Sequence, residues 1–162
     1  MASTSTGVDI RALPASVISG AIAGLVAGLP LGFIMLSRDT MPMVADLVAD
    51  PSTGFGWVVH LFNSALFGAV FGLLFARVAT RPAIVVVLGL VYGVAWWVLG
   101  ALWIMPVWLG MSEMAFEVGA DQWWSLVGHM AYGLLLGGLY VLPDLCCAAS
   151  SEIPCRSAGR TV

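Results

Sequence analysis

Four separate stretches of this sequence are each long and apolar enough to cross a lipid bilayer. They run roughly from Ser16 to Leu36, from Gly56 to Ala76, from Ala83 to Met105 and from Trp123 to Leu142. At about 1.5 Å of rise per residue, a helix of about 20 residues covers about 30 Å, the thickness of the hydrocarbon core. A single segment in lipid satisfies its own backbone polar groups only as a helix. The sequence therefore predicts an all-α, four-transmembrane-helix bundle.

The composition favours a membrane protein and excludes a nucleic-acid-binding one. Of the 162 residues, 60% are hydrophobic and only 9% are charged, which is far more apolar than a typical soluble domain. The net charge is −3 and the chain has no lysine, so it offers no basic surface for nucleic acid. The expected partners are the lipid bilayer and either a second copy of the chain or another membrane protein.

The placement of arginine predicts the orientation in the membrane, because short arginine-rich flanks of a span stay in the cytoplasm. Only Arg38 lies on one side of the four stretches. The other side carries Arg11, Arg77, Arg81, Arg156 and Arg160. We therefore expect a multi-pass plasma-membrane protein whose two tails, residues 1–15 and 143–162, are cytoplasmic. The membrane domain is then residues 16–142, and its two longer, acidic connections lie outside the cell.

The two halves of the chain carry the same landmarks in the same order: a Gly-rich span, a Met-Pro pair, a Trp shortly before a His, and a Gly eight residues after that His. In the first half these are Gly24, Gly28, Met41-Pro42, Trp57, His60 and Gly68, and in the second they are Gly89, Gly93, Met105-Pro106, Trp124, His129 and Gly137. Because each half holds two spans, both copies enter the membrane from the same side. The pattern predicts two parallel helix-pair repeats, over about 16–78 and 82–142.

This order of motifs resembles a family of uncharacterised small bacterial and archaeal membrane proteins. The resemblance covers roughly residues 17–142 and rests on the Gly-rich, Met-Pro and Trp-His-Gly motifs. It implies a duplicated four-helix fold. Since that family has no assigned activity, the resemblance transfers no catalytic residue. The second half departs from the first in its Trp-to-His spacing and in its longer acidic connection.

Each histidine shares a helix face with small residues at a spacing of four. The two sets are His60, Ser64 and Gly68 in one span and His129, Gly133 and Gly137 in another. An imidazole in hydrocarbon is unfavourable unless it is hydrogen-bonded or liganded. One hypothesis is therefore a cofactor site in which the two histidines ligate haem b or hydrogen-bond a quinone. In the alternative, the glycines only allow close helix packing and each histidine only bridges helices, with Asn63 and Tyr132 as nearby partners.

Methionines concentrate in the predicted outer halves and outer connections. Thioether and imidazole groups suit copper(I), and acidic connections raise the local concentration of cations. A second hypothesis is therefore a copper(I) site that combines the two histidines with Met41, Met43, Met111 and Met114. In the alternative, these methionines fill gaps in short helices that lie in the membrane interface, over residues 42–50 and 107–118.

No motif in the sequence indicates an enzyme. The chain has no phosphate-binding loop, no Rossmann glycine pattern and no HExxH, and no span carries an acid or arginine at its centre. We therefore expect a non-enzymatic binding or structural protein. Binding of haem or quinone, copper(I) handling, and docking of a partner through the glycine faces remain the alternatives.

Overall fold

The computed structural model describes residues 13–48, 50, 52–76 and 81–149, with the side chains of the last helix described to residue 142. Within these ranges the chain is helical and forms no strand, which confirms the all-α class. The elements in chain order are α1 (Leu13–Ser37), α2 (Met41–Asp46), α3 (Thr53–Phe75), α4 (Pro82–Trp96), the π-helix η3 (Trp97–Ile104), α5 (Met105–Trp108), the 3₁₀ turn η4 (Ser112–Met114) and α6 (Ala120–Ala149).

Four helical segments are long and apolar enough to span a membrane, which confirms the four predicted stretches. They are Leu13–Ser37, Thr53–Phe75, Pro82–Trp108 and Ala120–Leu142. The helices extend beyond the predicted ends, since α1 begins at Leu13 and α6 continues to Ala149. Hydropathy marks only the part of a helix that lipid would cover, whereas backbone hydrogen bonding continues past it. Residues 1–12 and 150–162 of the two predicted tails lie outside the described residues.

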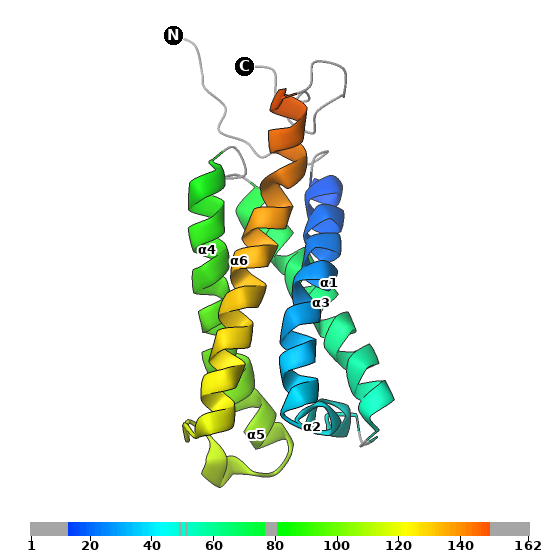
Figure 1. Ribbon diagram of the computed structural model, residues 1–162, viewed down its shortest axis with the longest axis vertical. Coiled ribbons are helices and arrows are strands. Elements are labelled where there is room, and N and C mark those ends of the chain that lie inside the picture. Colours follow the sequence, from blue (N-terminus) through cyan, green and yellow to red (C-terminus); the bar gives the residue numbers. More distant parts are fainter. Residues whose placement is uncertain (1–12, 49, 51, 77–80, 150–162) are drawn as a thin grey trace.

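The bundle consists of two helix pairs, α1 with α3 and α4 with α6, and the contact of α1 with α6 joins them. The short helices α2 and α5 lie at the same end, where α1 ends and α6 begins (Figure 1). We call this the loop end. Between 22% and 39% of each span is buried inside the bundle. Most of each helix therefore presents apolar side chains outward, as a lipid environment requires.

Within each pair the helices approach through glycines. A Cβ atom at Gly20 would overlap the Gly68 carbonyl of α3, and one at Gly24 would overlap the Ser64 carbonyl. The same kind of backbone contact joins α4 and α6 at Gly89, Gly93 and Gly133. Without a side chain at these positions, two backbones can pack directly, which supplies the close contact that drives helix association in lipid.

Three tyrosines connect α3 to the second helix pair. Their hydroxyls donate to backbone carbonyls of α3: Tyr92 to Phe67 at 2.8 Å, Tyr132 to Ser64 at 2.8 Å and Tyr140 to Gly72 at 3.2 Å. The ring of Phe71 packs edge-on against Tyr140, with centroids 5.6 Å apart. The two pairs are thus joined by an aromatic core whose polar atoms are satisfied by backbone.

The third span changes its geometry before it reaches the loop end. Residues of η3 form a π-helix, and Pro106 then lacks the N–H that would bond the Leu102 carbonyl in an α-helix. The backbone N–H of Phe116 donates to this carbonyl at 2.8 Å. The connection after α5 therefore folds back onto the span.

The two segments expected as interfacial helices are helical only in part. In the segment over 42–50, the helix α2 continues to Asp46. In the segment over 107–118, only the end of α5 and the turn η4 are helical.

Candidate functional site

His60 is buried between α1 and α3, and its imidazole bridges the two helices. Its Nε2–H donates to the Gly28 carbonyl at 2.9 Å, because a carbonyl oxygen can only accept. The Ser64 hydroxyl donates to the His60 carbonyl at 2.8 Å. The side chain is 6% exposed, so this hydrogen bond satisfies a ring nitrogen that water does not reach freely.

His129 is half-buried on α6 and is bonded within its own helix. Its Nδ1–H donates to the Ser125 carbonyl, one turn earlier, at 2.8 Å. The backbone partners of both imidazoles correct the expectation that Asn63 and Tyr132 would bond them, since the Tyr132 hydroxyl donates to a carbonyl of α3 instead. For His60 the physical reason is the close packing of α1 on α3, which brings the Gly28 carbonyl within reach of the ring, whereas the His129 ring bonds the nearest carbonyl of its own helix.

The small residues near the histidines are covered by neighbouring helices. Gly68 packs on Gly20 and Gly24, and the position of Gly137 is closed by the backbone at Val85. Gly133 packs on α4 in the same way. Binding of haem or quinone at His60, His129, Ser64, Gly68, Gly133 and Gly137 stays a prediction. Such binding has one specific requirement. Before Nε2 of His60 can act as a ligand, its hydrogen bond to the Gly28 carbonyl must break.

A small cavity at the loop end is lined by four methionines. Its volume is about 50 Å³, and its walls come from α2, η3, α5, η4, α6 and the connection before α6. The methionines are Met43, Met105, Met111 and Met114, joined by Ala101, Leu102, Pro106, Glu117 and Gln122. We call this the methionine cavity. It lies where the folded-back connection meets the third span.

The methionine cavity gathers three of the four methionines predicted as metal ligands. Met41 is the exception: it is fully buried and lies against Gly56 of α3. Met41 and Met43 are two residues apart, about 200° around a helix, and so cannot share a face. Neither histidine lines the cavity. Of the predicted copper(I) ligands, Met43, Met111 and Met114 thus line one cavity, whereas Met41 and the two imidazoles do not line it.

Six lining residues of the methionine cavity were not predicted as site residues, and three of these carry side-chain donor atoms: Met105, Glu117 and Gln122. The available signal was the Met105-Pro106 pair, because a proline inside an apolar span frees a carbonyl one turn earlier. That carbonyl, on Leu102, is the one that anchors the returning connection. The sequence did not reveal which amide would bond it.

The polar groups of the methionine cavity are an amide and a carboxylate. The Gln122 side-chain oxygen accepts from the Gly119 N–H at 3.0 Å, and the Gln122 carbonyl accepts from Nε1 of Trp97 at 3.0 Å. Glu117 is tied to the turn through its backbone N–H, which donates to Met114 at 3.1 Å. Among the described residues, no three or more His, Cys, Asp or Glu side chains are grouped to hold a metal. The candidate donors here are therefore mainly thioethers.

An open hollow of about 590 Å³ lies beside the methionine cavity and shares Met43 and Met111 with it. We call it the outer hollow. Its other lining residues are Asp46, Leu47, Val48, Trp108 and Leu109. Nε1 of Trp108 donates to the Leu47 carbonyl at 3.1 Å. This hydrogen bond connects α5 to the turn after α2 and so joins the loop-end segments of the two helix pairs.

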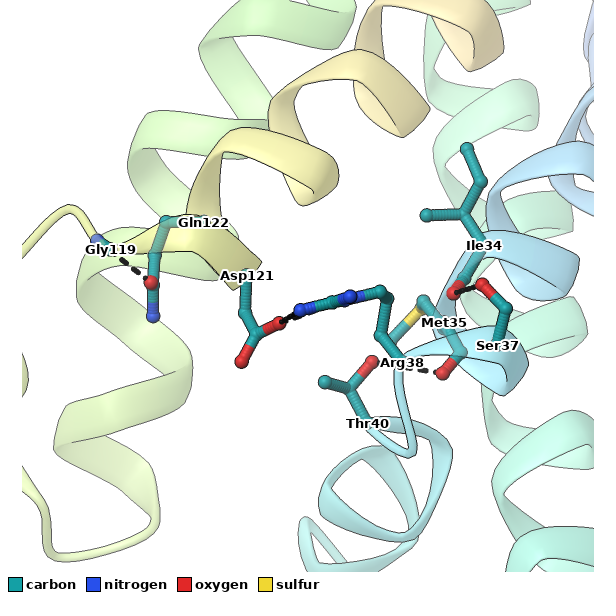
Figure 2. Close-up of polar contacts among 8 residues, drawn as sticks. All are labelled: Ile34, Met35, Ser37, Arg38, Thr40, Gly119, Asp121 and Gln122. Carbon is teal, nitrogen blue, oxygen red and sulfur yellow. Dashed lines mark hydrogen bonds and ion pairs between the residues drawn. The ribbon is translucent and has the colours of Figure 1, made fainter.

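An ion pair also links the helix pairs at the loop end. Arg38, just after α1, and Asp121, at the start of α6, extend toward each other (Figure 2). Nε and Nη2 of Arg38 donate to the same Asp121 oxygen at 2.9 and 2.6 Å. The two side chains are 39% and 53% exposed, so solvent and salt screen the pair.

We expect this ion pair to contribute little stability. A double-mutant cycle of Arg38→Ala and Asp121→Ala, read by unfolding in mixed micelles, should give a coupling energy of about 0.2–1 kcal/mol. The coupling should shrink in 0.5 M salt, roughly a threefold higher ionic strength than physiological. A salt-independent coupling above about 2 kcal/mol would contradict this and would indicate a desolvated pair.

The chain matches no protein-family model, no curated protein and no solved structure.

Proposed function

We propose that this protein is a non-enzymatic plasma-membrane protein that binds one copper(I) ion, a soft monovalent cation, in the methionine cavity. The observation that carries the proposal is that four methionines line one small cavity: Met43 of α2, and three methionines from the segment that ends the third span and follows it. Thioethers are soft ligands that favour copper(I) over harder divalent ions. The ligand set proposed here therefore consists of methionines alone, whereas the sequence-based hypothesis combined methionines with the two histidines.

The size of the cavity favours an ion over an organic cofactor. Its volume of about 50 Å³ is far below the roughly 300–1,000 Å³ of typical small-molecule pockets. A cavity of this size has room for a few water molecules at most, so it suits a single ion. A haem or quinone would not fit there.

The charge of the cavity also suits a monovalent cation. A bare ion in an apolar site is strongly unfavourable unless an opposite charge is near. The Glu117 carboxylate belongs to a lining residue and can offset one positive charge, while the Gln122 amide supplies a neutral dipole. Four neutral thioethers and one carboxylate together match a +1 ion better than a +2 ion.

We also propose that the loop end lies outside the cell and that both termini lie in the cytoplasm, because arginine concentrates on the side of the termini.

We further propose that the two helix pairs are copies of one unit. Matching contacts support this: Gly24 packs on Ser64 and Gly68 of α3, while Gly89 packs on Gly133 and Gly137 of α6. His60 and His129 then hold equivalent positions. In this proposal they are helix-packing residues.

The test is a copper(I) titration of the purified, detergent-solubilised protein, under anaerobic and reducing conditions, in competition with a coloured copper(I) chelator. We expect one equivalent per chain, with no comparable binding of zinc or magnesium. An absorption spectrum of the same preparation, expressed with haem supplied, serves as the control for the haem alternative. Copper no higher than in empty micelles would overturn the proposal, and a Soret band would favour the histidine site instead.

A further inference from the structure

The outer hollow and the methionine cavity have a common wall. Met43 of α2 and Met111, just before η4, line both. The outer hollow is wide and open, whereas the methionine cavity is more enclosed and about one-tenth its size. The two spaces are therefore adjacent at Met43 and Met111.

We infer that the outer hollow is the entry site for the copper(I) bound in the methionine cavity, with Asp46 attracting the arriving cation and Met43 and Met111 passing it inward. This inference rests on the proposed function. Copper(I) and silver(I) have the same charge and the same preference for soft ligands, so both should enter by this route. Met43 and Met111 line both spaces, so they are the thioether residues that an ion entering by this route would meet.

Asp46 is the charged residue that lines the outer hollow. It is exposed, ends α2 and does not line the methionine cavity, so in this route it acts on arriving ions and is no ligand of the bound ion. A charge placed on the approach path raises the association rate and has little effect on the final affinity. The hydrogen bond from Trp108 to the Leu47 carbonyl keeps the two sides of the hollow together.

The experiment measures silver(I) binding by stopped-flow tryptophan fluorescence in chloride-free nitrate buffer. We expect Asp46→Asn to slow association about three- to tenfold at low ionic strength, with equilibrium affinity within about twofold of wild type. The difference should disappear at high ionic strength. Asp39→Asn is the matched control, because Asp39 is another exposed acid of the loop end that lines neither space. Its φ of +52° is readily adopted by asparagine.

A second pair of variants distinguishes residues that affect entry of the ion from residues that affect its retention in the methionine cavity. Met43→Leu, at the shared wall, should slow association and weaken binding, whereas Met114→Leu, in the methionine cavity alone, should mainly speed dissociation. Equal association rates for wild type, Asp46→Asn and Met43→Leu would overturn the entry route while leaving the methionine cavity intact. If the wild-type protein binds no silver(I) or copper(I), the proposed function itself fails.

Discussion

Replacement of Gly24 by leucine should destabilise the helix bundle by at least about 3 kcal/mol, which corresponds to a loss of about 6–12 °C in melting temperature. A Cβ atom at this position overlaps the Ser64 carbonyl and closely approaches the Gly68 backbone. Neither is the end of a flexible side chain that could move aside. The α1 and α3 helices must therefore separate, and the contact that holds them together in lipid is lost. The measurement is thermal unfolding of the detergent-solubilised protein, followed by size-exclusion chromatography.

Gly138 provides a matched control within the membrane-spanning part of α6. No atom lies within 4 Å of a Cβ placed at this position. Gly138→Leu should therefore leave stability within about 1 kcal/mol of wild type, or raise it slightly, because leucine has the better helix propensity. Equal losses in the two variants would show that the chain tolerates no bulk on any glycine, and would contradict the packing described for Gly24.

Replacement of Met111 and Met114 by leucine should lower copper(I) affinity at least about 100-fold. Even partners outside the ligand shell of a metal site affect affinity by about 10–100-fold, so loss of two ligands should exceed that. Leucine and methionine have similar volumes, and such exchanges usually change stability by less than about 1.5 kcal/mol. The fold should therefore survive. The measurement is the chelator competition proposed above for the wild-type protein.

The matched control is the double variant Met35→Leu and Met130→Leu. It removes the same number of thioethers from α1 and α6, at positions that do not line the methionine cavity. Its copper(I) affinity should equal that of wild type. Equal affinity in both double variants would mean that the bound copper does not use Met111 and Met114.

The spans and the position of close packing were predictable, because both depend on periodic features of single helices. Apolar length identified the four spanning segments, and glycines four residues apart marked faces on which backbones can meet. The contacts of Gly20 and Gly24 with α3 agree with that expectation. The π-helix was not predictable in the same way. It depends on how the third span accommodates Pro106 and the returning connection together.

The methionine cavity was only partly predictable, because it forms from tertiary contacts in irregular segments. Residue type singled out Met43, Met111 and Met114, and the structure brings these three together. Sequence spacing could not reveal that Met41 faces α3 while Met43 faces the cavity, since that depends on where the short α2 begins. Nor could it show that the imidazoles would bond backbone carbonyls.

The most direct test of the central claim is X-ray absorption spectroscopy of copper in the protein loaded with one equivalent of copper(I). If the methionine cavity holds the ion, the first coordination shell should be dominated by sulfur, and the number of sulfur ligands should fall in the Met111→Leu, Met114→Leu variant, which keeps only Met43 and Met105 in the cavity. A first shell made only of nitrogen and oxygen would contradict the account and would point to His60 and His129.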